Sequence, residues 1–152
     1  MPALISPERP DTPDAQALIA ELEAHLASFY PVESRHGFSV AKLLAENVAF
    51  FVTRHDGAPA GCGGIKLFGT DYGEVKRMFV RPPYRGLGLG RLMLDHLIGF
   101  ARRNGVNLVR LETGIYQPEA ISLYERAGFH RIAPFGDYTD DPLSLCYEKR
   151  LE

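Results

Sequence analysis

The chain has 152 residues, of which 45% are hydrophobic and 24% charged, values typical of one soluble globular domain. Its net charge of −2 argues against a general nucleic-acid-binding protein. Two cysteines are too few for a disulfide-stapled secreted domain, and neither a signal peptide nor an apolar run long enough to span a bilayer is recognisable. We therefore expect one cytoplasmic domain, residues 1–152, that binds neither nucleic acid nor membrane.

Charge is distributed unevenly along the chain. Between Glu74 and Arg103 there are seven basic and two acidic residues, whereas between Glu8 and Glu23 there are five acidic residues and one arginine. A basic middle on an acidic molecule suits a discrete polyanionic ligand, such as a nucleotide cofactor, better than a long duplex. The same distribution also fits ordinary solvated helix and strand surfaces.

The N-terminal part of the chain is predicted to be mainly helical. Thr12-Pro13-Asp14 indicates a helix start, with a capping hydroxyl, proline at the first helical position and an acid in the first turn. Apolar residues follow at helical spacing, and Pro31 ends the run. Ser39 predicts the cap of a shorter helix that extends to about Glu46.

Three apolar segments then predict strands at 48–55, 60–67 and 73–80. Between the first two lies Asp56-Gly57-Ala58-Pro59, whose composition predicts a hairpin. Pro82-Pro83 stops the third strand, since proline cannot donate to a sheet.

The second half alternates helices with strands. Apolar periodicity predicts a helix over 88–104, ended by Gly105, and another that begins near Pro118 and ends at Gly128. Strands are predicted at 107–113, 129–133 and 143–149. The resulting order, β-α-α-β-β-β-α-β-α-β-β, combines an antiparallel meander with a strand–helix–strand crossover, so the fold class is α+β, or mixed α/β.

Residues 80–91 carry the strongest functional signal. A strand runs into a loop with glycines at 86, 88 and 90, and the loop opens a long apolar helix. Helix N-terminal N–H groups, glycines that let phosphate approach the backbone, and the donors Arg85 and Arg91 together predict a pyrophosphate site. A tight turn that happens to need glycine is the simpler alternative. The dinucleotide pattern G-x-G-x-x-G fails because Arg91 lies three positions after Gly88, and the Walker pattern is absent.

Two motifs resemble those of the GNAT superfamily of N-acetyltransferases. Arg85-Gly86-Leu87-Gly88-Leu89-Gly90 matches R/Q-x-x-G-x-G/A, which in that family holds the pyrophosphate of coenzyme A. Residues 117–129 resemble N-x-x-A-x-x-x-Y-x-x-x-G-F, with Gln117 where asparagine is commoner. The resemblance covers about Val48 to Leu151. It implies a single GNAT-like domain whose mixed, mostly antiparallel central sheet has a splayed pair of parallel strands and about four flanking helices.

The resemblance also implies which residues bind acetyl-CoA. Backbone groups of Phe79 and Val80 would pair with the pantetheine amides, as an added strand does. Tyr124 corresponds to the tyrosine that often protonates the departing thiolate, and the alternative is a core aromatic on an inward helix face. The implied cofactor-binding residues are Phe79, Val80, Arg85, Gly86, Leu87, Gly88, Leu89, Gly90, Arg91, Gln117, Ala120 and Tyr124.

Attack on a thioester requires a neutral amine, while alkyl amines are mostly protonated at pH 7, so a general base is expected, acting directly or through water. Glu74, at the head of the strand that leads into the glycine loop, is the first candidate because several family members keep a catalytic glutamate there. Glu112, Asp137, His36 and His130 are the rivals. An exposed strand-end carboxylate is the alternative interpretation of Glu74.

The acceptor pocket is expected from two segments that correspond to variable parts of the family, 29–38 and 135–142. Arg35 would suit a carboxylate such as that of an amino acid, whereas acids near the mouth would suit a cationic amine; ordinary surface loops are the third interpretation. The candidate acceptor-binding residues are Tyr30, His36, Phe38, Glu112 and Tyr138.

Together these features predict an enzyme that transfers an acetyl group from acetyl-CoA to a primary amine of a small molecule or peptide. Direct attack in a ternary complex is expected, as is a monomer or homodimer without metal ligands. A non-catalytic acyl-CoA sensor is the alternative from a different class. A sensor would not need Glu74 and Tyr124, which this chain has.

Overall fold

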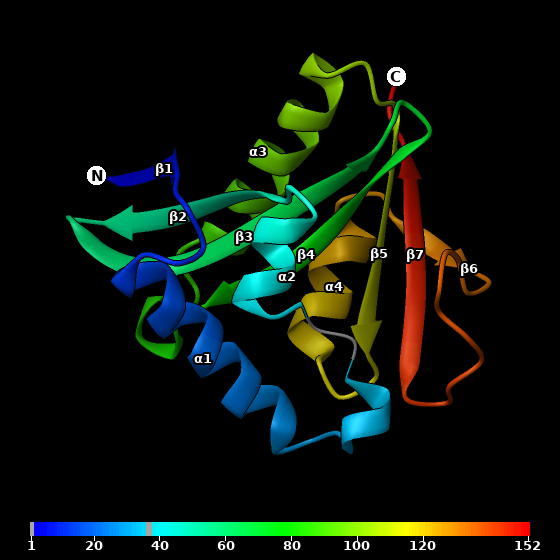
Figure 1. Ribbon diagram of the computed structural model, residues 1–152, viewed down its shortest axis with the longest axis horizontal. Coiled ribbons are helices and arrows are strands. Elements are labelled where there is room, and N and C mark those ends of the chain that lie inside the picture. The colour runs from blue at the N-terminus through cyan, green and yellow to red at the C-terminus, as the bar shows by residue number, and fades with distance from the viewer. Residues whose placement is uncertain (1, 36–37) are drawn as a thin grey trace.

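One mixed β-sheet organises the protein. The computed structural model describes residues 2–35 and 38–152, and within them seven strands lie in the order β1-β2-β3-β4-β5-β7-β6 (Figure 1). In chain order the elements are β1 (Ala3–Pro7), α1 (Pro13–Ala27), α2 (Val40–Ala45), β2 (Ala49–His55), β3 (Ala58–Phe68), β4 (Tyr72–Val80), α3 (Leu89–Arg103), β5 (Leu108–Gly114), α4 (Pro118–Arg126), β6 (His130–Ile132) and β7 (Ser144–Arg150), with short 3₁₀ turns at Val32–Ser34 and Pro82–Tyr84. The predicted element order and the mixed α/β class are confirmed.

Side-chain caps begin the two N-terminal helices where the sequence predicts them. The Thr12 hydroxyl accepts a hydrogen bond from the Ala15 N–H at 3.2 Å, and Pro13 occupies the first helical position of α1. The Ser39 hydroxyl accepts from the Lys42 N–H at 3.1 Å at the start of α2. Each cap satisfies a backbone donor that the helix itself leaves without a partner.

The β2–β3 hairpin is tighter than the sequence suggests. Asp56 and Gly57 form a two-residue turn with φ angles of 52° and 85°, and His55 pairs with Ala58. A turn with positive φ at both positions follows the right-handed twist of the flanking strands. Ala58 and Pro59 therefore belong to β3, not to the connecting loop.

Apolar side chains cover both faces of the sheet. On one face α1 and α2 pack through the buried cluster Ala15, Leu18, Ile19, Leu22, Phe38, Leu43, Val48, Phe50, Val52, Cys62 and Phe79. On the other face α3 and α4 pack through a second cluster that includes Met93, Leu97 and Tyr124. Because successive strand residues point to opposite faces, β2 contributes residues to both clusters: Phe50 lies in the first and Phe51 in the second.

The parallel strands β4 and β5 pair over a short stretch only. Their register joins Gly73 to Val109 and Glu74 to Arg110, and the rest of β4 has no partner in β5. Figure 1 shows the two strands side by side at one end and apart at the other. The splayed pair that the family resemblance implies is confirmed. Beyond Glu74, β4 therefore presents an edge whose backbone N–H and C=O groups are not paired with β5.

Candidate active site

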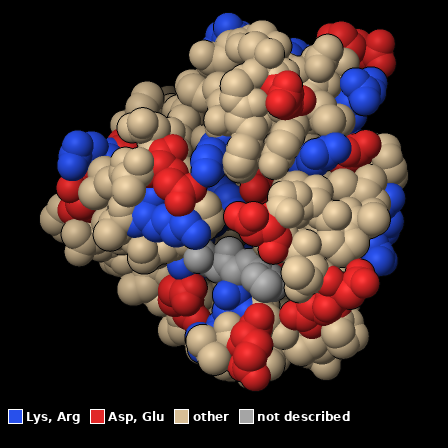
Figure 2. All heavy atoms as spheres, turned by 45° about the vertical axis from the view of Figure 1, so that its right-hand side comes forward, with Lys and Arg blue, Asp and Glu red and all other residues tan. Residues whose placement is uncertain are grey.

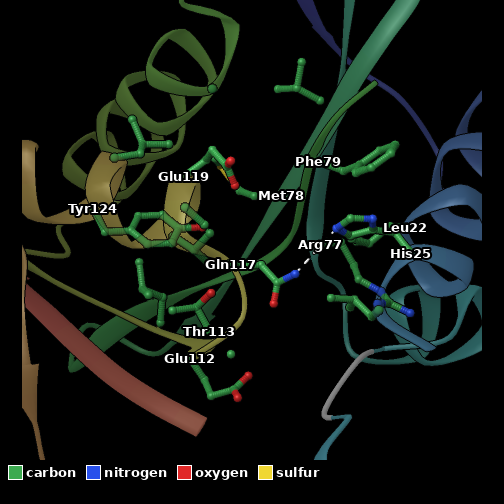
Figure 3. Close-up of a pocket in the computed structure, with 18 of the residues that line it drawn as sticks. Leu22, His25, Arg77, Met78, Phe79, Glu112, Thr113, Gln117, Glu119 and Tyr124 are labelled. Atoms are coloured by element: carbon green, nitrogen blue, oxygen red, sulfur yellow. Dashed lines mark hydrogen bonds between the residues drawn. The ribbon is translucent and has the colours of Figure 1, made fainter. Parts of the chain in front are cut away.

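A cleft of about 820 Å³ opens where β4 and β5 separate. Residues 75–80 of β4 and 111–114 of β5 form its sides (Figure 3). Further lining comes from loop 84–91, from α4, from the last turns of α1 and the residues after it as far as Arg35, and from Phe38. Both sequence motifs and the first predicted acceptor segment thus meet at one cavity.

A β-bulge in β4 shapes one side of this cleft. Arg77 has a φ of 56°, and the register between β3 and β4 shifts beside it. As a result Lys76 and Arg77, neighbours in sequence, both contact Phe38: Lys76 Nζ lies 3.9 Å from the centre of its ring, and Arg77 Nε donates to its carbonyl oxygen at 2.9 Å. Arg77 also pairs with Glu23 at 2.7 Å. These contacts offset the strain of a positive φ at a residue other than glycine.

The glycine loop enters α3 with open space beside two glycines. Gly86 and Gly88 have φ angles of 85° and 79°, and a Cβ built at either would meet no atom within 4 Å. Gly88 is the N-cap of α3 and supplies no side-chain cap, so the first N–H groups of the helix favour an anion. Gly90 serves packing, since its Cβ would lie 3.3 Å from Leu123 of α4.

The other predicted residues of this loop differ in exposure. Leu87 is exposed and does not line the cleft, whereas Leu89 is buried in the core. Arg85 and Arg91 are exposed and line the cleft. Arg85 Nε donates to the Val80 carbonyl oxygen at 2.9 Å, and Arg91 pairs with a carboxylate one turn later in α3.

Several basic residues between Glu74 and Arg103 form ion pairs with acidic residues of the same chain. Arg77 of β4 and Arg81, which directly follows β4, pair with Glu23 and Glu21 of α1, each at 2.7 Å. The negative charges near the start of the sequence therefore partly compensate the positive charges in its middle. Figure 2 shows positive and negative side chains intermingled over the face in view. The linear charge count thus overstates how basic the surface of this region is.

Helix α4 supplies Tyr124 and Ala120 to the cleft. The Tyr124 ring is 6% exposed and packs edge-on against Phe129, and its hydroxyl points into the cleft (Figure 3). Burial, with a smaller contribution from the charge of Glu112, raises the pKa of Tyr124. The phenol therefore stays protonated at neutral pH and can donate a hydrogen bond.

Gln117 bridges the two sides of the cleft. Its Oε1 accepts a hydrogen bond from the Tyr30 hydroxyl, and its Nε2 lies 3.5 Å from His25 Nε2 on α1 (Figure 3). The Tyr30 hydroxyl in turn accepts from the Tyr116 N–H at 2.8 Å. The end of α1 and the loop before α4 are therefore fastened together through polar contacts across the cleft.

Glu74, the first candidate for the general base, is buried in an ion pair. Its Oε2 lies 2.9 Å from Lys76 Nζ and accepts a hydrogen bond from the Tyr138 hydroxyl at 2.5 Å. Burial raises the pKa of Tyr138, and the charge of Glu74 adds to the effect. Lys76 and Tyr138 line the cleft, and Glu74 is not among the described residues that do. The base role of Glu74 stays a prediction, and its neighbours occupy the positions nearer to the cavity.

Glu112 is placed differently. It lines the cleft from β5, and its Oε2 accepts a hydrogen bond from the Ser144 hydroxyl at 2.7 Å (Figure 3). Asp137 and His130 are exposed and lie outside the cleft lining. Of the candidate bases that the structure describes, Glu112 alone lines the cavity; His36 lies outside the described residues.

The predicted acceptor-binding residues Tyr30, Phe38 and Tyr138 all line the cleft, and Tyr30 and Phe38 are buried. Sequence reasoning missed His25, Lys76 and several other lining residues. A signal was present for Lys76, because it lies two positions after Glu74 on a predicted strand and so on the same face. No comparable signal marked His25, in the last turn of α1.

Comparison with known proteins identifies the family. Residues 15–129 match the sequence model of the Acetyltransferase (GNAT) family. The chain belongs to this family. A GNAT relative from Azospirillum brasilense, named IAA acetyltransferase, is 44% identical over 135 residues, which cover 88% of each protein.

Solved structures agree with this assignment. A Klebsiella pneumoniae protein assigned as an acyl-CoA N-acyltransferase superposes with a TM-score of 0.84 at 34% identity, over 99% of this chain and 98% of the other. The PaiA N-acetyltransferase of Thermoplasma acidophilum, solved with coenzyme A, superposes with a TM-score of 0.76 at 21% identity, over 99% of both chains, and supports the fold alone.

As a GNAT acetyltransferase, the protein is an acyltransferase that uses acetyl-CoA. Within residues 2–35 and 38–152, no helix is both long enough and apolar enough to cross a membrane.

Proposed function

We propose that this GNAT protein transfers the acetyl group of acetyl-CoA to a primary amine of a small molecule or peptide, by direct attack within a ternary complex. The observation that carries the proposal is one cavity that reaches from the glycine loop past Tyr124 to Glu112 (Figure 3). A shared cavity brings donor and acceptor together and replaces a bimolecular encounter with a positioned one.

The residues present fit acetyl-CoA in two respects. Open space beside Gly86 and Gly88, at the start of α3, suits a pyrophosphate, and the exposed arginines of the loop add charged donors. The edge of β4 at Phe79 and Val80 is unpaired with β5 and suits the pantetheine amides, as in strand addition. When bound, acetyl-CoA supplies the acetyl group as an activated thioester.

Tyr124 is proposed as the proton donor to the sulfur of the departing coenzyme A thiolate. Its raised pKa keeps the hydroxyl protonated, and the hydroxyl points into the cleft. A model phenol has a pKa of about 10 and a thiol about 8.5, so a hydrogen bond to the developing thiolate is chemically sound without complete proton transfer.

Glu112 is proposed as the group that takes the proton of the acceptor amine, directly or through one water. It is favoured over Glu74 because Glu112 lines the cleft and Glu74 does not. Glu74 then acts indirectly, by holding the cleft-lining side chains of Lys76 and Tyr138 in place.

The relative from Azospirillum, named IAA acetyltransferase, supports a small-molecule acceptor. The name of a relative does not identify the acceptor of this chain, so peptides with a free amino terminus stay in the panel of acceptors to be tested.

Thiol release from acetyl-CoA in the presence of an amine library tests the function. We expect calorimetry to show acetyl-CoA binding, and thiol release that depends on the amine, with the N-acetylated product identified by mass spectrometry. Binding without thiol release for any amine would indicate the acyl-CoA sensor instead. Failure of the folded protein to bind acetyl-CoA would remove both functions.

A further inference from the structure

The charged side chains that line the cleft form two groups. Arg85, Arg91, Glu119 and Arg126 belong to the glycine loop and α4, and the remaining described charged residues of the lining are Arg35, Lys76, Arg77 and Glu112. The second group lines the part of the cavity formed by β4, β5 and the segment after α1. The charges of this second group are therefore expected to contact the acceptor and not the cofactor.

Two of these charges are matched inside the protein. Lys76 Nζ lies 2.9 Å from a Glu74 carboxylate oxygen, and Arg77 lies 2.7 Å from Glu23. An ion pair of this kind leaves little net attraction for a charged ligand, because the partner carboxylate screens the cation at close range. Lys76 and Arg77 are therefore poor candidates for binding an anion.

Arg35 differs from both. Its Nε is buried, and no hydrogen-bond acceptor for it exists among residues 2–35 and 38–152. A buried donor without an acceptor is costly, more so on a charged group, and native proteins rarely keep one unless a ligand, ion or water supplies the acceptor. The guanidinium fork matches a carboxylate in geometry and charge.

We infer that the acceptor is a free amino acid, whose carboxylate binds Arg35 while its amine faces Glu112. This inference rests on the proposed function and narrows its substrate. A cation and a carboxylate that line one cavity complement a molecule with both charges, which a simple alkylamine or the N-terminus of a long peptide does not offer close to its amine.

The residues that line the same part of the cavity indicate which kind of side chain the acceptor amino acid has. Leu22, Leu26, Phe29, Tyr30, Phe38 and Tyr116 line it. Phe29 and Tyr116 are 45% and 48% exposed, and the Tyr30 and Tyr116 rings are 5.5 Å apart. Partly exposed aromatic surface at a binding cavity favours apolar ligand groups. The acceptor therefore belongs to the apolar and aromatic amino acids.

Matched pairs of amines that differ only in the carboxylate test the inference. L-Phenylalanine is compared with 2-phenylethylamine, L-tyrosine with tyramine, L-tryptophan with tryptamine and L-leucine with 3-methylbutylamine, at saturating acetyl-CoA. For at least one pair we expect kcat/KM to be about 10–100-fold higher with the carboxylate, the usual contribution of a hydrogen bond to a charged group.

Variants then locate the preference. Arg35→Met should lower kcat/KM for the amino acid by about the same factor and leave the decarboxylated amine unchanged. Arg35→Lys should restore part of the loss, since it keeps the charge but not the planar fork. Arg102→Met, an exposed arginine of α3 that does not line the cleft, is the matched control and should behave as the parent.

The outcomes separate this inference from the proposed function. Equal kcat/KM within every pair, or an equal effect of Arg35→Met on both members of a pair, would overturn the amino-acid assignment while amine acetylation stands. Acetyl-CoA binding without acetylation of any amine would instead overturn the proposed function itself.

Discussion

The hydroxyl of Tyr30 lies against the α-carbon of Gly114, with no room for a Cβ between them. Tyr30 follows α1, and Gly114 is the last residue of β5, so this contact joins the two sides of the cleft. The same hydroxyl bonds the Tyr116 N–H and the Gln117 side chain. The absence of a side chain at Gly114 therefore allows Tyr30 to position the loop that leads into α4.

Replacement of Gly114 by alanine tests this arrangement. The new methyl group overlaps the Tyr30 ring and hydroxyl, so we expect a loss of about 1–3 kcal/mol in the free energy of unfolding and a large loss of turnover. Urea unfolding and thiol-release assays measure the two effects. Gly99→Ala is the control, because its Cβ meets only the flexible end of Arg103, and it should stabilise α3 by up to about 1 kcal/mol. Parent-like stability and turnover in Gly114→Ala would contradict the account.

Gly88→Ala tests the glycine loop. The left-handed φ of 79° strains any other residue, and a Cβ there would occupy the open space assigned to the pyrophosphate. Calorimetry should show at least a tenfold weaker affinity for acetyl-CoA, equivalent to about 1.4 kcal/mol. Gly69→Ala is a matched control with a φ of 57° outside the cleft lining, so it shares the backbone strain but should keep the affinity. Equal weakening in both variants would attribute the effect to strain alone.

Tyr124→Phe tests the proton donor. The ring keeps its packing against Phe129, so folding and acetyl-CoA affinity should change little. Turnover should fall by about 10²–10⁴-fold, the usual contribution of a positioned acid. Single-turnover measurements report the rate of acetyl transfer itself, separately from product release. An unchanged single-turnover rate would indicate that Tyr124 is only a core aromatic residue.

Local features of the sequence predicted most of the fold. Thr12 and Ser39 cap their helices as expected, because a cap depends on residues within one turn. The glycine loop was recognisable for the same reason: strand, glycines and helix are contiguous in the chain. Helix and strand periodicity placed most other boundaries within two residues. Two elements differ: α1 ends at Ala27, before the predicted stop at Pro31, and no bounds were predicted for β1 (Ala3–Pro7).

Features that depend on distant contacts were not predictable. The bulge at Arg77 reverses the strand alternation, and its stabilising partners Glu23 and Phe38 lie 54 and 39 residues away. Tyr30 and Gln117 are 87 residues apart and show no pattern that pairs them. Glu74 was selected by its position in the strand, but whether a carboxylate faces a cavity or a lysine depends on side chains from other elements. The preference for Glu112 over Glu74 as the proposed base therefore rests on contacts that only the structure shows.

Glu112→Gln and Glu74→Gln should have different consequences. Glu112→Gln removes the proton acceptor at the cleft, so turnover should fall and recover in part as pH rises and more neutral amine becomes available. Glu74→Gln leaves the buried Lys76 without its carboxylate and should cost about 3–5 kcal/mol of stability. Lys76→Met added to Glu74→Gln should recover part of this stability. Rate–pH profiles and urea unfolding distinguish the two variants. A pH-dependent loss of turnover in Glu74→Gln, together with a loss of stability in Glu112→Gln, would instead identify Glu74 as the base.

The stability of the protein should decline in mild acid because of His96. Its Nε2 is buried with no acceptor or donor among the described residues, and the ring packs against Phe51 at 4.5 Å. Burial, with a smaller effect from the charge of Arg103, lowers the pKa of His96 below its ordinary value of 6.5. As pH falls below about 6.5, the unfolded chain gains a proton that the folded protein resists, so stability falls by at most about 1.4 kcal/mol per pH unit.

His96→Leu should remove this part of the pH dependence. The leucine keeps an apolar contact with Phe51 and cannot be protonated, so the loss of unfolding free energy between pH 7.5 and about 5 should be smaller than in the parent. Urea midpoints measured across this range give the comparison. If His96→Leu and the parent lose the same stability, the acid sensitivity arises elsewhere, and burial of His96 does not set it.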